Sequence, residues 1–262
     1  MSAQLKEVPG QATRSLEGRV ADAEWQVRVE LAACYRLCAH FRMTDLIYTH
    51  ISARVPGPEH HFLINAYGLM FDEITASALV KVDIEGNIIE DLTGLGINPA
   101  GFVIHSAIHK VREDAKCVIH THTSAGLAVA AQAAGLLNLS QHSMRFHRRI
   151  GYHDYEGVAL EMDEQQRLQA SLGVHNALIL RNHGLLTCGS SVANAFDEMY
   201  YLERACQAQI GALSGGVKVL VAADEVAERV ACQFERPERQ SRSKHWVACL
   251  RLLDRLDPSY KH

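Results

Sequence analysis

The most constraining feature of this sequence is the presence of two hydrophobic spacings in one chain. Short segments such as 50–55 place apolar residues at every second position, the period of a half-buried strand. The segment 191–213 places them every three or four positions, the period of a helix with one buried face. The wholly apolar run Ala177 to Leu180 is typical of a strand covered on both sides. These spacings predict an α/β protein with helices on the faces of a mixed sheet.

Turn-forming residues divide the predicted strands into hairpins. The turn Pro56-Gly57-Pro58 separates the strand near 50–55 from a partner at Phe62 to Asn65. A second hairpin is predicted on either side of Glu85-Gly86-Asn87. The helix predicted after Pro99 is followed by a strand over Cys117 to His122.

The chain of 262 residues is long enough for one large domain with a well-buried core. Residues 1–20 are polar and aperiodic, so they are predicted to form a loose N-terminal arm. Residues 21–214 carry the strand and helix patterns of the main domain. Residues 215–262 turn charged and hold two short helical patterns, near 222–235 and 244–256, which predict an appended helical extension.

Charge and composition exclude several classes of partner. The net charge of −4 and the lack of a long basic run argue against nucleic acid. A substrate anion is the more natural partner of the small basic cluster Arg145, Arg148 and Arg149. No stretch reaches the roughly 18 apolar residues that a membrane helix needs. Seven cysteines without CxxC spacing indicate reduced core residues, so we expect a cytoplasmic protein.

Three histidines form a candidate metal site. His120 and His122 lie two apart on a predicted strand, so both imidazoles leave the same face. His183 follows the buried strand Ala177 to Leu180, in a turn where Gly184 lets the backbone bend. Three imidazoles with an open position are typical of a catalytic site for zinc or a similar divalent metal. For any single histidine a purely structural role is the alternative, because HxH alone is a weak signal.

Seven segments in order carry a resemblance to a known family. The sequence resembles the class II aldolase/adducin domain over about residues 25–215, and the residues of these segments are closer to the adducin head than to the sugar-phosphate aldolases. The segments are Thr44 to Ser52, His61 to Leu69, Glu73 to Ser77, Asn98 to Phe102, His120 to Thr123, Tyr152 to Tyr155 and Arg181 to Leu185.

The resemblance implies a three-layer α/β/α fold around a largely antiparallel central sheet, and a homotetramer with sites near subunit interfaces. It also implies that His120, His122 and His183 bind zinc, with manganese as the alternative. In the family's enzymes the metal acts as a Lewis acid that stabilises an enediolate or related carbanion. We therefore expect a divalent metal cofactor and a small-molecule substrate.

The sequence departs from the aldolases at several positions. Gly101 stands where they place a glutamate that acts as metal ligand and proton carrier, and Ser143 stands where they place a tyrosine donor. Most of the small donors that hold phosphate in the aldolases are absent. The loss of these small donors argues against a phosphorylated substrate, since phosphate binding rests on charge-assisted hydrogen bonds of this kind. The corresponding positions here are Thr49-His50, Asn65, Tyr67 and Pro99-Ala100.

The function expected from this resemblance is a metal-dependent carbon–carbon lyase. Its substrate would be a non-phosphorylated hydroxy, aromatic or sugar-derived acid, cleaved by decarboxylation or by retro-aldol chemistry. The candidate proton-transfer residues are His50, Tyr67 and His142, each with a structural role as its alternative. The candidate substrate-binding residues are Asn65, Arg145 and His147, and the alternative for the last two is a solvated patch or a subunit contact.

A second hypothesis is a non-catalytic binding or scaffolding module like the adducin head. The adducin head keeps comparable histidine motifs and the same glycine as Gly101. The present sequence lacks the long basic tail by which such proteins reach their partners. The enzyme is therefore the favoured interpretation, and metal content separates the two.

Overall fold

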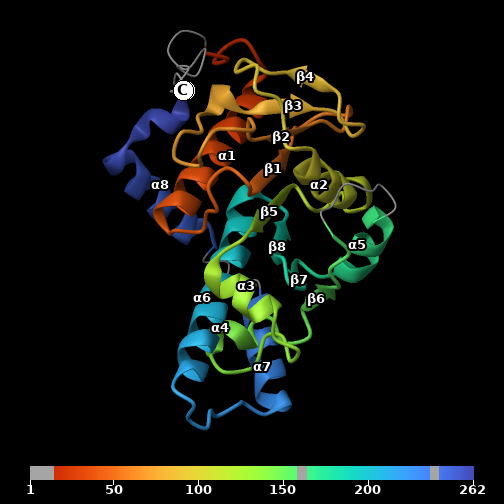
Figure 1. Ribbon diagram of the computed structural model, residues 1–262. Coiled ribbons are helices and arrows are strands. Elements are labelled where there is room, and N and C mark those ends of the chain that lie inside the picture. Colours follow the sequence, from red (N-terminus) through yellow and green to blue (C-terminus); the bar gives the residue numbers. More distant parts are fainter. Residues whose placement is uncertain (1–14, 158–163, 237–241) are drawn as a thin grey trace, which may run out of the picture.

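The computed structural model describes residues 15–157, 164–236 and 242–262 (Figure 1). Most of the predicted N-terminal arm, residues 1–14, lies outside the described residues. None of the helices within those ranges is both long and apolar enough to cross a membrane.

The centre of the molecule is an eight-stranded sheet with the order β4-β3-β2-β1-β5-β8-β7-β6. Neighbouring strands run antiparallel except for the parallel pair β6 and β7, which confirms the prediction of a largely antiparallel sheet. The strands are β1 (His50–Arg54), β2 (Phe62–Ile64), β3 (Val80–Val82), β4 (Ile88–Glu90), β5 (Cys117–Thr121), β6 (Ile150–His153), β7 (Ala177–Leu180) and β8 (Gly184–Gly189).

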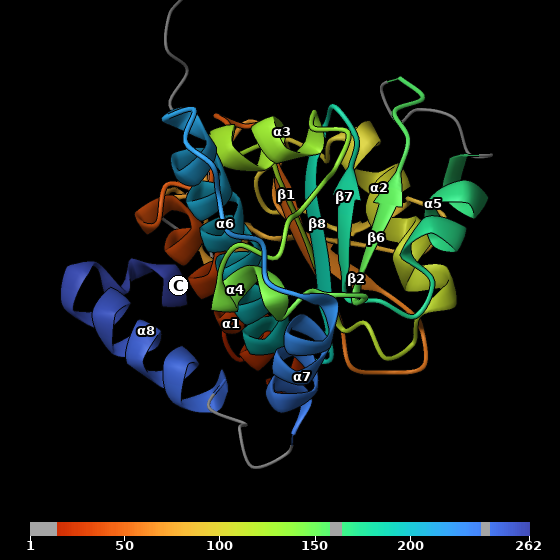
Figure 2. The same cartoon turned by 90° about the horizontal axis from the view of Figure 1, so that it is seen from below.

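Helices cover both faces of this sheet, which gives the expected three layers (Figure 2). Helices α2 and α5 lie on one face, and α1, α3 and α6 lie on the other. The helices are α1 (Asp22–His40), α2 (Pro99–Val111), α3 (Ser124–Ala130), α4 (Gln141–Met144), α5 (Glu164–Leu172), α6 (Val192–Ser214), α7 (Asp224–Glu235) and α8 (Arg242–Leu256), with short 3₁₀ helices at Ala76–Ala78 and Pro258–Lys261.

The alternation of side chains along each strand creates two separate cores. Cys117 and Ile119 of β5 point into the larger core, which α1 and α6 share. Val118 lies between them in sequence and joins the smaller core under α2 and α5. Since His120 has the same parity as Val118, it faces the α2 side of the sheet. The period of two therefore decides which face carries the histidines.

Helix α2 begins at a well-formed N-terminus that fixes its position over the sheet. The Asn98 side chain accepts a hydrogen bond from the backbone N–H of Ala100, and Pro99 occupies the first helical turn. Its buried face carries His105 and His109, four residues apart, directly above β1. The start of the helix thus brings Gly101 and His105 to the end of the sheet where the candidate metal ligands lie.

The C-terminal residues pack on the domain. Helices α7 and α8 form where the two helical patterns were predicted. Helix α8 packs against α1 and α6 (Figure 1). Its Trp246 and Leu253 are buried in the larger core. The Arg36 side chain of α1 pairs with Asp257 at 3.1 Å, which ties the end of the chain to the first helix. The extension is thus a part of the folded body.

Candidate metal centre and its cavity

Three imidazoles converge at the end of β5 that lies beside the turn between β7 and β8. The Nε2 atoms of His120 and His122 are 2.8 Å apart, and the ring of His183 lies 4.8 Å and 4.9 Å from theirs, centroid to centroid. One ligand atom from each ring lies within 4.8 Å of the other two. The structure therefore brings together all three histidines that the sequence singled out, and this group can hold a metal ion.

Hydrogen bonds outside the cluster orient two of the three rings. The Nδ1 atom of His120 lies 3.0 Å from the carbonyl oxygen of Leu185, and Nδ1 of His122 lies 3.0 Å from Oδ2 of Asp45. Both partners are acceptors, so each Nδ1 carries the hydrogen and each Nε2 keeps its lone pair for a metal. This arrangement of carbonyl or carboxylate, imidazole and free Nε2 is the usual support of a histidine metal ligand.

Burial keeps His120 and His183 in the neutral form that binds metal. Burial is the main cause that lowers the pKa of His183 to about 4, and the neighbouring His122 lowers it further. Burial also lowers the pKa of His120 well below its ordinary value, with smaller contributions from the other histidines. Metal ligation needs deprotonated nitrogen donors. A set of imidazole nitrogens suits a metal of intermediate softness such as zinc.

Gly184 allows β8 to pass close to the cluster. A Cβ atom at this position would lie 2.4 Å from the carbonyl oxygen of Thr121 and 3.1 Å from the His122 ring. Asn182, two residues before Gly184, takes a left-handed backbone conformation with φ of 55°, which asparagine tolerates better than most residues. The Asn-His-Gly sequence therefore suits a tight turn that presents His183 to the two strand histidines.

A cavity of about 470 Å³ opens in front of the three rings. Neither lysine nor arginine lines it among the described residues. The lining combines neutral polar groups with tyrosine rings, and its one carboxylate, Asp45, is already bonded to His122. The lining residues are Asp45, Tyr48, His50, Tyr67, Asn98, Pro99, Ala100, Ile104, His120, His122, Tyr155, Gly157 and His183.

His50 occupies the space that a side chain at position 101 would need. It is the cross-strand partner of His120, so the sheet register places their rings 5.0 Å apart. A Cβ atom at Gly101 would lie 2.6 Å from Cδ2 of His50 and 2.9 Å from its Nε2. His50 and any side chain at 101 therefore exclude one another in this arrangement. The glycine and the histidine are one structural feature.

Other predicted site residues divide between the cavity and the core. Tyr67 lines the cavity. Asn65 is buried away from it, where its Oδ1 accepts a hydrogen bond from the Tyr35 hydroxyl at 2.9 Å. His142 lies on α4, and its ring contacts Tyr201 of α6 at 5.0 Å. Within the described residues, Asn65 and His142 are thus not brought to the three histidines.

Arg145 and His147 also lie away from the cavity. The Arg145 guanidinium is buried between Asp197 at 2.7 Å and Glu198 at 2.8 Å, so its charge is already neutralised. The Nδ1 atom of His147 is 3.1 Å from the Asn138 amide. Within the described residues these two side chains are therefore not brought to the cavity, and their partners come from segments that the local sequence does not reveal.

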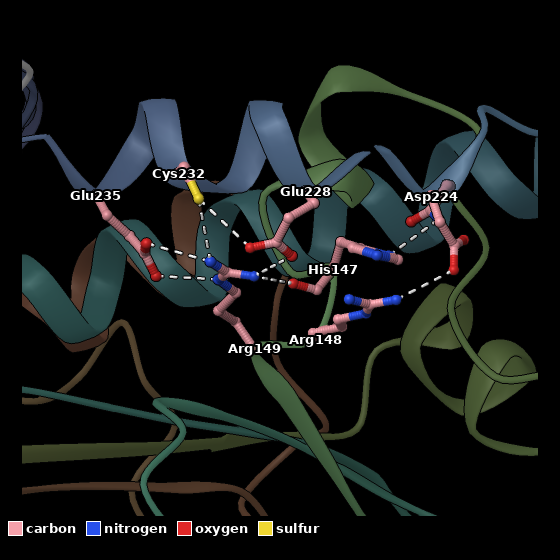
Figure 3. Close-up of polar contacts among 8 residues, drawn as sticks. His147, Arg148, Arg149, Asp224, Glu228, Cys232 and Glu235 are labelled. Carbon is pink, nitrogen blue, oxygen red and sulfur yellow. Dashed lines mark hydrogen bonds and ion pairs between the residues drawn. The ribbon is translucent and has the colours of Figure 1, made fainter. Parts of the chain in front are cut away.

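The rest of the basic cluster holds helix α7. Figure 3 shows Arg149 between Glu228 and Glu235, with Arg148 near Asp224. The nitrogen–oxygen distances are 2.6 Å from Arg149 to Glu228, 3.0 Å from Arg149 to Glu235 and 3.4 Å from Arg148 to Asp224. Hydrogen bonding to Arg149 is the main cause that lowers the pKa of Glu228 to about 2. The predicted anion-binding cluster thus binds anions of the chain itself.

Several cavity residues were not singled out by sequence reasoning. Asp45, Tyr48 and Tyr155 stand in the motifs quoted above, but loop residues have no periodicity that reveals the direction of a side chain. Asn98 gave a usable signal, since an asparagine before a proline marks a helix start, and helix starts often border sites.

The sequence and the fold match known proteins. The family model described as "Class II Aldolase and Adducin N-terminal domain" matches residues 29–210, and the chain belongs to this family. The crystal structure of an aldolase II superfamily protein from Pseudomonas syringae is 54% identical with a TM-score of 0.91, covering 95% of this chain and all of that one (100%). An L-fuculose 1-phosphate aldolase from Glaciozyma antarctica is 26% identical with a TM-score of 0.80, covering 96% of each chain. Alpha-adducin from Rattus norvegicus is 45% identical over 76% of this chain and 27% of its own length.

Proposed function

We propose that this protein is a metal-dependent carbon–carbon lyase whose metal is held by His120, His122 and His183. The observation that carries the proposal is the convergence of three imidazoles on one open cavity. Zinc is the metal that this all-nitrogen set favours, with manganese as the alternative. Similarity to an L-fuculose 1-phosphate aldolase supports the reaction class.

The cavity favours a substrate without phosphate. In the described part of the chain no cationic side chain lines it, so a phosphate dianion would lack the charge-assisted contacts that usually hold it. The rings of Tyr48, Tyr67 and Tyr155 offer stacking surfaces and hydroxyl groups instead. These features suit a hydroxy, aromatic or sugar-derived acid.

The chemistry divides between the metal and the chain. When bound, the metal supplies a Lewis acid that takes up the negative charge developing on the substrate oxygen as the carbon–carbon bond breaks. Decarboxylation and retro-aldol cleavage both need one proton at the carbon or oxygen that is left. His50 is the residue on this chain best placed to hold that proton, because its ring lies 5.0 Å from that of His120 and lines the cavity. Tyr67, which also lines the cavity, is the second candidate proton donor.

A binding module is the second candidate function. The identity of 45% with alpha-adducin from Rattus norvegicus favours it. A module of this kind needs no metal and no open cavity, whereas the lyase needs both. The two functions therefore differ in an observable that requires no knowledge of the substrate.

The test combines metal analysis with a reaction screen. Protein purified without chelator is assayed for zinc and manganese, and then for release of carbon dioxide or an aldehyde from hydroxy, aromatic and sugar acids. We expect turnover that a chelator abolishes and that added metal restores. Replacing the exposed His40 by alanine is the matched control and should change neither metal content nor turnover. Metal-free protein that turns over none of these acids, yet binds a protein partner, would favour the module.

A further inference from the structure

A continuous chain of hydrogen bonds runs from the cavity into the core on the α2 side of the sheet. The Nδ1 atom of His50 lies 2.8 Å from Nε2 of His105. The other nitrogen of that ring, Nδ1, contacts the Ser52 hydroxyl, which lies 2.8 Å from Nε2 of His109. All four side chains are buried. Each of the four side chains is thus hydrogen-bonded to the next one in the series.

Two structural periods bring these four residues together. His50 and Ser52 are two apart on β1, so both point to the same face of the sheet. His105 and His109 are four apart on α2, so both point down onto that face. The two pairs interdigitate because α2 packs over β1.

Burial keeps the inner histidines neutral. It is the main cause that lowers the pKa of His105 well below the ordinary range, and that lowers the pKa of His109 to about 3. The charge of Arg54 acts on His109 in the same direction. A neutral imidazole carries one hydrogen, so one ring nitrogen donates and the other accepts.

Only two proton orders satisfy every contact in the chain. If His50 donates through Nδ1, then His105 accepts at Nε2 and carries its own hydrogen on Nδ1. Ser52 accepts that hydrogen bond and donates to Nε2 of His109, so all three rings are protonated on Nδ1. If the direction is reversed, all three are protonated on Nε2.

A mixed set of tautomers breaks the chain. Two facing donors, or two facing lone pairs with no cation between them, cannot share the 2.8 Å contact between His50 and His105. If both histidines donated to Ser52, the hydroxyl hydrogen would lack a partner, since Ser52 makes no other side-chain hydrogen bond within the described residues. The state of the far end is therefore transmitted to His50.

We propose that His105, Ser52 and His109 are positioning residues that fix the tautomer and the ring orientation of His50. They thereby decide whether the cavity meets a bare nitrogen or an N–H group at His50 Nε2. This inference rests on the proposed lyase function for its catalytic meaning, since His50 is the residue that handles the proton there. The tautomer itself is a property of the folded chain and can be measured without a substrate.

The first test uses the unaltered protein loaded with Zn²⁺ alone. Nitrogen-15 labelling of the histidines, followed by nuclear magnetic resonance, reads which ring nitrogen of each carries the hydrogen. We expect His50, His105 and His109 to share one tautomer, either all Nδ1–H or all Nε2–H. A mixed set would overturn the proposal, and this measurement does not depend on whether a variant folds.

The second test interrupts the series of hydrogen bonds at Ser52. Ser52→Ala removes the hydroxyl that joins the two inner histidines, so the signals of His50 should shift to a mixture of tautomers. Ser106→Ala is the matched control, because Ser106 is an equally buried serine on α2 whose hydroxyl bonds Val103 and Gln165 instead. Identical His50 signals in the Ser52→Ala variant and the unaltered protein would overturn the proposal.

A third measurement separates this proposal from the function on which it rests. With a substrate found in the screen, Ser52→Ala should lower kcat by about tenfold or more, while KM and zinc content stay unchanged. Equal kcat in the Ser52 and Ser106 variants would overturn the positioning role. If no acid is turned over although zinc is bound, the lyase function fails, and the tautomer measurement still decides whether the chain sets the form of His50.

Discussion

The two faces of strand β5 differ in the role of the side chains that they carry. On the α1 and α6 side, Cys117 and Ile119 are fully buried among apolar side chains. On the α2 side, His120 near the end of the strand and His122 just beyond it both line a cavity with polar walls. Adjacent residues of one strand therefore serve stability on one face and chemistry on the other. The comparison teaches that a single register shift would exchange the two roles.

The largest expected effect lies on the apolar face. Ile119→Ala removes a fully buried side chain next to the candidate metal ligand His120, and the cavity left behind should lower the free energy of unfolding by about 2–5 kcal/mol. Because the side chain points away from the cavity, the metal content should not change. Urea unfolding in the presence of chelator, together with elemental analysis, measures both. Loss of metal in this variant would break the separation of the two faces.

The polar face should make the protein sensitive to acid. The pKa of His109 falls from 6.5 to about 3 on folding, so the unfolded chain binds the extra proton between these values, and stability falls as the pH drops through this window. Lowering the pH from 7.5 to 5 should cost about 2 kcal/mol through His109 alone. His105 acts in the same direction. His109→Gln should make the urea midpoint depend less on pH, and an unchanged dependence would contradict the burial of a neutral ring.

A smaller effect is expected at Gly101. Alanine normally stabilises a helix by up to about 1 kcal/mol relative to glycine. Here the new Cβ would collide with His50 at 2.6 Å, so Gly101→Ala should instead destabilise the protein by about 1–2 kcal/mol. Gly211→Ala is the control, because the same helical substitution in α6 meets nothing within 4 Å and should be neutral or stabilising.

A double variant sharpens this comparison. His50→Ala removes the ring that a side chain at 101 meets, so adding Gly101→Ala to it should carry no further cost. Additive losses in the double variant would show that the glycine and the histidine act independently. Unfolding curves of the two single variants and the double variant supply the coupling.

The smallest effect is expected at α7, far from either face of β5. Arg149→Gln removes the guanidinium that Glu228 and Glu235 share, so the backbone amides of α7 should exchange hydrogen faster. The two ion pairs of Arg149 are partly exposed to solvent, which weakens their contribution to stability. The global unfolding midpoint and the metal content should therefore stay the same. Arg255→Gln on the exposed face of α8 is the control. Loss of metal in the Arg149 variant would revive a role for the basic cluster at the site.

Local periodicity was sufficient for some features of the molecule. The spacing of two placed His120 and His122 on one face, and the long helical pattern predicted α6 almost to its ends. The resemblance supplied the three-layer architecture, which the sheet order confirms. These features depend on neighbours in sequence or on a shared fold, so they are readable before the structure is known.

Features that depend on distant segments could not be read. Arg145 looked available for a substrate because its partners, Asp197 and Glu198, stand more than fifty residues later, on α6. The fit of His50 against Gly101 depends on the register between β1 and β5 and on the position of α2. No periodicity in one segment contains that information. The chain from His50 to His109 has the same origin.

The most direct test of the central claim is the metal content of His122→Ala. His122 supplies one of three nitrogens and is partly exposed, so its loss should remove the ion without unfolding the chain. We predict about one divalent metal ion per chain in the unaltered protein, none in the variant, and nearly equal unfolding midpoints for the two in chelator. Full metal occupancy in the variant, or a metal-free unaltered protein after purification with zinc and manganese present, would contradict the account.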